Sequence, residues 1–317
     1  MRYAKKISSS YILRARSRSG QVEKFSTRFA RSNNNSIITI GIFDGVHKGH
    51  QAILKKVIGE AGKSRLKSVV ITFDPHPVKI LSPGAKIPFL MSLEHRIRLI
   101  KKMGVDDCLV MRFTKEFSRL SPEDFIKRVL INKLNLKALV TGGNFLFGFK
   151  EKGSVDLLRK LSGTYDFKFY SVPPLKIGGN FISSTRIRRL IEKGDLKPAS
   201  KMLGRPVTIL GTVAKGRRLG RKIGFPTANI DPHHESIPPS GVYSVDVALG
   251  EKKYRGILNI SAHKIIEAHI FNFKRDIYGR DIEVIFKQKI RDEKKFNSLE
   301  ALKKQIQLDI LQAALSK

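Results

Sequence analysis

The sequence has almost no cysteine, few acidic residues and no long apolar run. Cys108 is the single cysteine, which excludes a disulfide framework and a zinc site built from cysteine ligands, and which fits a reducing compartment. No apolar run approaches the roughly 20 residues that a membrane-spanning helix needs. The 317 residues are 41% hydrophobic with a mean hydropathy of −0.20. This composition is typical of a globular chain of about two domains.

The shortage of acids leaves a large positive charge. There are 61 Lys+Arg against 27 Asp+Glu, for a net charge of +34. Such a surplus suggests a polyanionic partner: a nucleic acid, an anionic membrane surface or phosphorylated small molecules. The charge is diffuse, with no block of five or more Lys/Arg and no basic stripe interleaved with aromatics. We attribute most of it to compositional bias, and a basic nucleic-acid-binding protein is the remote alternative.

Residues 1–36 form a basic N-terminal extension. They hold nine Lys/Arg against Glu23 alone, show no periodicity and end in the loop signal of residues 32–36. An Arg- and Ser-rich, acid-poor stretch is typical of an organellar transit peptide. We favour instead the extension of a bacterial cytoplasmic protein, with organellar import as the alternative.

From Ile37 onward, short apolar runs alternate with helical patterns. Strands are expected at residues 37–40, 68–73, 108–113, 138–141 and 167–170. Helices are expected at residues 50–61, at 93–103 and after the Ser121 cap. This alternation predicts a parallel sheet covered on both faces. Ser183 or Ser184 caps a further helix, which runs to Lys193 and stops at Gly194.

Between Val207 and Ile290 the sequence pattern changes to short runs typical of β-strands. Strand patterns separated by Gly and Pro occupy residues 207–213, 241–249, 253–260, 267–273 and 281–286. They predict a small antiparallel barrel or sandwich. A final amphipathic helix is expected from about 299 to 310, with an apolar face made of Leu299, Leu302, Ile306 and Ile310. The expected domains are therefore 37–188, a helical connector at 189–203, and 204–317.

Two histidines follow the first strand in a glycine-rich stretch, residues 41–50. The spacing places His47 and His50 on one face of a helix start, beside its free N–H groups. Gly45 and Gly49 let backbone approach a phosphate closely. The pattern favours a phosphoryl ligand at the carboxyl end of a strand. Two alternatives stay open: histidines without a ligand, and a zinc site whose third ligand would come from the turn at 74–77.

A second glycine-rich, basic stretch covers residues 211–230. It lacks the Lys-Ser/Thr ending of a P-loop, which excludes that motif. Its glycines, together with Lys215, Arg217, Arg218 and Arg221, can cradle phosphates. The alternative is a flexible surface hairpin.

Four motifs in the first half resemble the adenylyltransferase module of bacterial bifunctional riboflavin kinase/FAD synthetases. The first, residues 41–50, also resembles the H-x-G-H element of nucleotidyltransferases, and the others are 72–77, 143–148 and 182–188. The resemblance implies that His47 and His50 contact the ATP phosphates and stabilise charge during adenylyl transfer. It also implies that Asp44 helps to organise the loop and the magnesium-nucleotide. Further nucleotide- or phosphate-binding positions implied in this way are Gly41, Phe43, Gly49, Asn144, Ser183, Ser184, Thr185, Arg186 and Arg188. A plain helix cap at residues 183–185 and a solvated face at the two arginines are the alternatives.

In the second half, the run Gly224–Asn229 resembles the riboflavin kinase signature. Further motifs follow in family order at residues 239–243, 256–260, 267–273, 276–280 and 290–296. The resemblance implies that Thr227 and Asn229 hold Mg²⁺ and the ATP phosphates, with Gly216, Gly220 and Pro226 beside them. It makes Glu267 the general base that takes the proton of the ribityl 5′-hydroxyl. The alternative for Glu267 is a paired residue on a surface strand.

The resemblance as a whole implies a bifunctional enzyme. A Rossmann-like nucleotidyltransferase domain would adenylylate FMN to FAD with release of pyrophosphate. An antiparallel β-barrel riboflavin kinase domain with a terminal helix would phosphorylate riboflavin to FMN. The expected partners are ATP, Mg²⁺, riboflavin and FMN, without a dedicated nucleic acid or membrane partner, in a monomer or weak homo-oligomer. Only residues 261–266 join Ile260 to Glu267, where the family usually has a longer segment. An adenylyltransferase with a weakened kinase is therefore the alternative.

Overall fold

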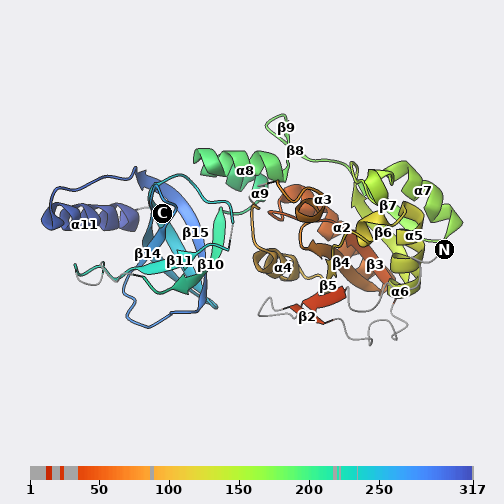
Figure 1. The fold of residues 1–317 in the computed structure, drawn as a ribbon, viewed down its shortest axis with the longest axis horizontal. Coiled ribbons are helices and arrows are strands. Elements are labelled where there is room, and N and C mark those ends of the chain that lie inside the picture. Colours follow the sequence, from red (N-terminus) through yellow and green to blue (C-terminus); the bar gives the residue numbers. More distant parts are fainter. Residues whose placement is uncertain are drawn as a thin grey trace. The chain divides into compact units, whose positions relative to one another are not determined.

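The computed structural model forms two compact units (Figure 1). One unit comprises Met1–Ile87 and Leu93–Ile182, and the other comprises Pro88–Ser92 and Ser183–Lys317. The residues that the structure describes are 12–15, 22–24, 35–85, 89–216, 220, 223–233 and 235–315. Among them, no helix is both long enough and apolar enough to cross a membrane.

A seven-stranded sheet, in the order β2-β1-β5-β4-β3-β6-β7, lies at the centre of the first unit. Its parallel part consists of β3 (Ser36–Ile40), β4 (Lys67–Asp74), β5 (Asp107–Arg112), β6 (Leu136–Gly142) and β7 (Lys168–Val172). The chain moves from β3 to β4 and β5, then returns to β6 on the other side of β3. Ligands of open parallel sheets bind at such a reversal, outside the carboxyl ends of the strands. The loops after β3 and β6 are therefore where a site is expected.

Helices connect these strands and cover both faces of the sheet. They are α2 (Lys48–Ser64), α3 (Pro77–Leu81), α4 (Leu93–Lys102), η3 (Phe117–Arg119), α5 (Pro122–Asp124), the π-helix η4 (Phe125–Ile131), α6 (Asn132–Leu134), η5 (Phe149–Glu151) and α7 (Val155–Thr164). Ile38 and Leu139 pack with side chains of η4 and α7, whereas their sequence neighbours Ile37 and Val140 pack with Val57 of α2. Alternation along each strand thus gives each face its own core. The prediction of a parallel sheet covered on both faces is confirmed.

Two strands of the sheet come from the basic N-terminal stretch: β1 (Ile12–Ala15) and β2 (Val22–Lys24). β1 pairs antiparallel with β5, placing Ile12 opposite Met111. No periodicity in the sequence indicates these strands. The open edge of β5 offers backbone partners to β1, and β2 pairs with β1 in turn. Side-chain patterns do not reveal such an edge. The rest of residues 1–34 lies outside the described part of the chain.

The strands of the second unit close into a barrel, in the order β10-β11-β14-β13-β12-β15. They are β10 (Thr208–Ala214), β11 (Ala228–Asp231), β12 (Gly241–Leu249), β13 (Lys252–Ile260), β14 (Ile266–Ile270) and β15 (Asp281–Arg291). Of the two expected architectures, barrel and sandwich, the barrel is the one that forms. The short strand β11 was not expected from the sequence, because its four residues lie inside the glycine-rich stretch.

Two helices precede the barrel: α8 (Ser184–Lys193) and α9 (Leu196–Leu203). As predicted, the hydroxyl of Ser183 caps α8 by accepting a hydrogen bond from Arg186 N at 3.3 Å. Gly194 ends the helix in the left-handed conformation with φ 85°, which glycine adopts without strain. α8 follows the small hairpin of β8 (Lys176–Ile177) and β9 (Asn180–Phe181).

The terminal helix α11 (Leu299–Leu315) covers part of the barrel's outer face. Ile306 and Ile310 pack against Val242 and Ile257, as the expected apolar face requires. Leu299 is 64% exposed, so its expected place on that face is wrong, because it is the first residue of the helix and precedes the packed part. A buried carboxylate holds the helix instead: Asp309 accepts a hydrogen bond from Arg291 Nη2 at 2.8 Å and another from Arg291 Nε at 2.9 Å.

A buried carboxylate also ties the segment Phe89–Ser92 into the second unit. Glu235 is 5% exposed. Its Oε1 accepts from Ser92 N and Ser92 Oγ, each at 2.7 Å, and its Oε2 accepts from Leu210 N at 3.0 Å. Ser236 N donates to Phe89 O at 2.7 Å. One side chain thus serves as the acceptor for both this segment and β10.

Glu235→Gln should lower the free energy of unfolding of the second unit by about 2 kcal/mol. An amide nitrogen cannot accept a hydrogen bond, so at least one buried N–H loses its acceptor. Thermal unfolding measures the change, and Glu251→Gln, in the exposed turn between β12 and β13, is the matched control. Equal melting temperatures for the two variants would contradict this assignment.

Candidate functional site

The two histidines stand together at the start of α2. His47 caps the helix, and its Nδ1 accepts a hydrogen bond from His50 N at 3.3 Å. The two rings are stacked, with centroids 3.6 Å apart. Because Nδ1 of His47 accepts, the proton of a neutral His47 ring is on Nε2. A Cβ at position 49 would lie 3.2 Å from the His47 ring, so glycine there permits the close packing of ring and backbone.

The loop before the histidines is bent by unusual backbone angles. Phe43, Gly45 and Val46 have φ values of 54°, 85° and 38°. Such angles cost energy in residues other than glycine and are concentrated at functional sites. The Phe43 ring is buried and meets His50 edge-on, with centroids 5.3 Å apart. A Cβ at Gly41 would lie 3.2 Å from that ring. Gly41 and Phe43 therefore shape the loop that carries the histidines.

A buried arginine that the sequence analysis missed belongs to this site. Arg96 of α4 is 5% exposed and donates from Nη2 to Phe73 O at 3.4 Å. Its Nε has no hydrogen-bond partner among the described residues. Burial lowers the pKa of Arg96, while the carboxylates of Asp44 and Asp74 oppose this effect. The sequence does hold a signal for the burial of Arg96. This residue precedes Ile100 by one helical turn and therefore lies on the core-facing side of the predicted helix.

The surroundings keep His50 uncharged. Burial, followed by the charges of His47 and Arg96, lowers the pKa of His50 well below 6.5. Its Nδ1 is buried without a hydrogen-bond partner among the described residues. Two imidazoles, the positive end of a helix and a guanidinium thus occupy one corner of the sheet, which is a suitable environment for phosphoryl oxygens.

Asn144 lies in the loop after β6, which is the neighbour of β3. The side chain of Asn144 is exposed, and the adjacent Gly143 N donates to Val172 O at 2.9 Å. The histidine loop and the Asn144 loop therefore leave two adjacent parallel strands at the same edge. In the turn at 74–77, the candidate source of a third zinc ligand, His76 caps α3. Its Nδ1 accepts a hydrogen bond from Val78 N at 3.1 Å. Within the described ranges, no three His, Cys, Asp or Glu side chains are grouped so as to hold a metal ion.

The serines and arginines of the fourth motif lie at the start of α8, in the second unit. Ser183, Thr185 and Arg186 are exposed, and Ser184 and Arg188 are half-buried. Ser183 is the helix cap described above. These residues present hydroxyls and guanidinium groups at a helix N-terminus, as a phosphate site requires.

On the barrel, three polar residues occupy one row across neighbouring strands. Asn229 of β11 lies opposite Glu267 of β14, and Glu267 lies opposite Asn259 of β13. Residues in register share a face, with Cβ atoms about 5 Å apart. All three side chains are half-buried. Asn259, which the sequence analysis did not single out, lies in the quoted run 256–260.

Two glycines bring the preceding loop against this row. A Cβ at Gly216 would lie 1.9 Å from Asn229 Nδ2. A Cβ at Gly220 would lie 3.0 Å from Thr227 Oγ1. The structure therefore brings Gly216 close to Asn229 and Gly220 close to Thr227. Lys215 is exposed, and Arg217, Arg218 and Arg221 lie outside the described residues.

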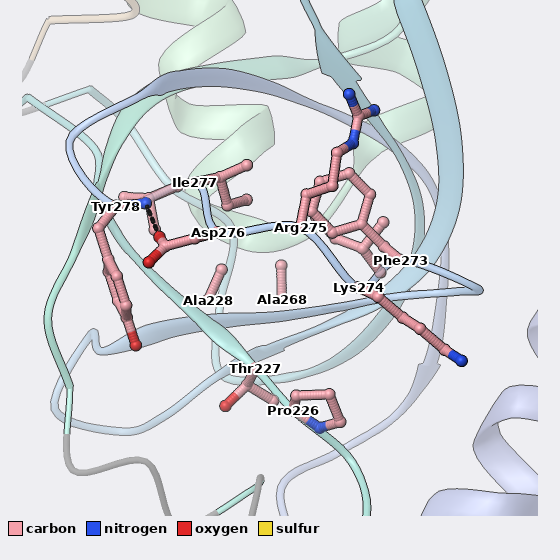
Figure 2. Close-up of a pocket in the computed structure, with 12 residues that line it drawn as sticks. Pro226, Thr227, Ala228, Ala268, Phe273, Lys274, Arg275, Asp276, Ile277 and Tyr278 are labelled. Atoms are coloured by element: carbon pink, nitrogen blue, oxygen red, sulfur yellow. Dashed lines mark hydrogen bonds between the residues drawn. The ribbon is translucent and has the colours of Figure 1, made fainter.

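A cavity of about 570 Å³ borders Pro226 and Thr227 (Figure 2). Its floor is made by the small side chains of Ala228 and Ala268, and the loop from Phe273 to Tyr278 closes one side. Tyr278 N donates to Asp276 Oδ1 at 2.9 Å, which holds this loop. Because strand neighbours alternate, the alanines face away from Asn229 and Glu267. The cavity and the polar row thus lie on the two sides of one ladder.

The connection between β13 and β14 is a tight turn. Ser261 N donates to Ile265 O at 2.9 Å, and Lys264 has φ 60°. Ala262 N donates to Glu293 Oε2 at 2.8 Å. The segment 261–266 therefore makes an ordered, short connection directly before Glu267.

Two family models match the chain, one in each half. The model described as FAD synthetase matches residues 29–186, and the model described as riboflavin kinase matches residues 203–316. A curated relative from Buchnera aphidicola subsp. Acyrthosiphon pisum, named bifunctional riboflavin kinase/FMN adenylyltransferase, is 38% identical over 289 residues. The match covers 88% of this chain and 92% of the relative.

Relatives of the same name from Escherichia coli strain K12 and Listeria monocytogenes are also 38% identical. Each match covers 87% of this chain, with 91% of the first relative and 90% of the second. A solved structure, described as a macrolide-efflux protein from Streptococcus pneumoniae, has a TM-score of 0.79 and 32% identity, covering 92% of this chain and 97% of that one. That description differs from the names of the curated relatives, with which both family models agree.

The lowered pKa of His50 predicts that acid destabilises the first unit. Below about pH 6.5 the unfolded His50 binds a proton while the folded one does not. The unfolded state then binds more protons, so stability is lost as the pH falls from 6.5 toward the folded pKa. Denaturant unfolding of the first unit at a series of pH values should show this loss, and His50→Gln should reduce the slope. The exposed control His263→Gln should leave the dependence of stability on pH unchanged. The same pH dependence in His50→Gln as in this control would contradict the prediction.

Proposed function

Because this chain belongs to the family of bifunctional riboflavin kinase/FMN adenylyltransferases, we propose a role for each group of residues in its two sites. The chain is a riboflavin kinase and an FAD synthetase. One activity converts riboflavin and ATP to FMN and ADP. The other converts FMN and ATP to FAD and pyrophosphate. One observation supports these roles. In each site, the charges and hydrogen-bonding groups of the side chains suit the charge that builds up during the proposed reaction.

For the division of the chain, we propose an adenylyltransferase domain at 37–188, a helical connector at 189–203 and a kinase domain at 204–317. The basic extension 1–36 precedes them. We also propose that the protein is cytoplasmic and that it is a monomer or a weak homo-oligomer. The positive charge of the chain is diffuse, and the substrates of the enzyme are small molecules.

In adenylyl transfer, an FMN phosphate oxygen attacks the α-phosphorus of ATP. The bond from that phosphorus to the bridging oxygen breaks, and pyrophosphate leaves with the electron pair. His47 and His50 donate to the phosphoryl oxygens where negative charge grows, aided by the N–H groups of α2. Asp44 and Arg96 hold the loop, and the Arg96 guanidinium adds positive charge behind His50. Asn144 binds a further phosphate or nucleotide group in the first unit. For Ser183, Ser184, Thr185, Arg186 and Arg188, at the start of α8, we propose phosphate binding by hydroxyls, guanidinium groups and a helix N-terminus.

A surface for the flavin ring lies beside Asn144 in the first unit. Leu146, Leu175 and Phe181 are 52%, 37% and 55% exposed. The two loops that carry them are adjacent, since a Cβ at Gly143 would lie 3.5 Å from Pro174 Cδ. Large exposed apolar side chains next to a polar site are typical of the platform on which an aromatic ligand rests.

In the kinase reaction, the ribityl 5′-hydroxyl oxygen attacks the γ-phosphorus, and Glu267 takes the hydroxyl proton as ADP leaves. Thr227 and Asn229 offer a hydroxyl and an amide oxygen, which are donors that fit Mg²⁺. When bound there, Mg²⁺ neutralises phosphate charge. Gly216 and Gly220 bring backbone N–H groups to the phosphates. The cavity beside Pro226 and Thr227 receives another part of the nucleotide.

Two variants separate the activities. With riboflavin, ATP and Mg²⁺ supplied and flavins resolved by chromatography, Glu267→Gln should lower FMN formation by about 100-fold or more, since it removes the base. His50→Ala should lower FAD formation from supplied FMN by about 100-fold, since it removes a donor to the growing charge. Each variant should keep the other activity. Equal loss of both activities in both variants would contradict the division of labour, and a wild-type chain that makes neither product would contradict the function.

Comparing riboflavin with FMN as the starting flavin also measures any weakening of the kinase by the short 261–266 turn.

Gly216→Ala tests the loop against Asn229. The added Cβ would lie 1.9 Å from Asn229 Nδ2, so the loop or the amide must move. We expect the KM for ATP in FMN formation to rise about 10-fold, because small displacements of phosphate-binding groups are costly. Gly62→Ala, where a Cβ meets open space in α2, is the control and should leave that KM unchanged. A similar KM in both variants would contradict the assignment of Gly216.

A further inference from the structure

His269 lies two residues after Glu267 on β14, beside the segment that leads into β11. In the β13–β14 register it is opposite Ile257. Its Nδ1 is 2.8 Å from Pro226 O. Its ring contacts Phe225 edge-on and Phe271 at a tilt, both with centroids 5.8 Å away. The half-buried imidazole thus contacts two phenyl rings and is hydrogen-bonded to the backbone of the Gly224–Asn229 run.

The direction of this hydrogen bond is determined by its acceptor. A carbonyl oxygen can only accept, so Nδ1 of His269 carries the proton and donates.

The bond holds the chain where the ladder between β11 and β14 stops. The last register pair is Ala228 opposite Ala268. Pro226 lacks an N–H, so it cannot donate to a continued ladder. Phe225 N reaches Gly220 O at 2.8 Å on the other side of the segment. His269 supplies a donor from β14 at the position where backbone pairing no longer can.

We propose that His269 is a positioning residue of the kinase site, which sets the Pro226 carbonyl and through it Thr227 and Asn229. The proposal rests on the proposed function of those two residues in binding the ATP phosphates. Thr227 adjoins Pro226, and Asn229 shares its register row with Glu267. The strand that carries the proposed base therefore also orients the loop that holds the phosphates, which couples the two reacting groups mechanically.

Two variants distinguish the hydrogen bond from the ring packing. His269→Phe keeps an aromatic ring between Phe225 and Phe271 but removes the donor. His269→Asn removes the ring but places an amide N–H where Nδ1 stands. We expect His269→Phe to raise the KM for ATP in FMN formation about 10-fold, while the KM for riboflavin stays within about twofold. His269→Asn should recover most of the affinity, and FAD formation from supplied FMN should be unchanged in both.

Amide hydrogen exchange of residues 223–229 in the unliganded full-length chain gives a readout that needs no kinase activity. Exchange there should be faster in His269→Phe and near the wild-type rate in His269→Asn. A wild-type KM for ATP and wild-type exchange in His269→Phe would overturn the proposal, as would equal impairment in the two variants. If exchange changes as expected but the wild-type chain forms no FMN, the proposed function fails while the positioning of the loop stands.

Discussion

In both units a glycine lets the backbone approach a side chain to which we assign a role in phosphate binding. The ring of His47 lies against Gly49 at the start of α2, and the amide of Asn229 lies against Gly216. A Cβ at either glycine would push the side chain or the loop away from the position that the proposed phosphate binding requires. The parallel sheet and the barrel serve to hold these contacts: one ends β3 and β6 at a common edge, and the other places β11 and β14 in register.

The composition of each site follows from its nucleophile. In adenylyl transfer, the attacking phosphate oxygen of FMN is already ionised, so no base is required, and the difficulty is the charge on the departing pyrophosphate. In the role that we propose for them, a helix N-terminus, two imidazoles and a guanidinium supply positive potential for that charge. In the kinase reaction, the nucleophile is an alcohol, which must lose a proton. A carboxylate on a rigid strand, beside oxygen donors for a metal-nucleotide, fits that need.

The buried charged side chains are mainly acidic, whereas the net charge of the chain is strongly positive. Among the described residues, the fully buried Asp and Glu side chains are Asp44, Asp107, Glu235 and Asp309, while Arg96 is the single fully buried Lys or Arg. Glu235 and Asp309 accept hydrogen bonds inside the fold, and the charge of Asp44 acts on Arg96. The surplus of +34 therefore belongs mainly to the outside. Cys108 adds no chemistry of its own, because burial raises the pKa of its thiol to about 12.

The sequence by itself determined the two-unit organisation, the strands from β3 to β7, the capped helix α8 and the motifs at the strand ends. These features depend on periodicity, caps and spacing, which are local properties. The tertiary structure alone decided that the β-rich half closes into a barrel and that β1, with β2 beside it, pairs with the edge of β5. It likewise decided that Arg96 lies behind His50, that Asn259 completes the row with Glu267, and that Asp309 rather than Leu299 anchors α11. Such contacts join residues far apart in the chain, and their energies depend on burial and on partners that no local pattern specifies.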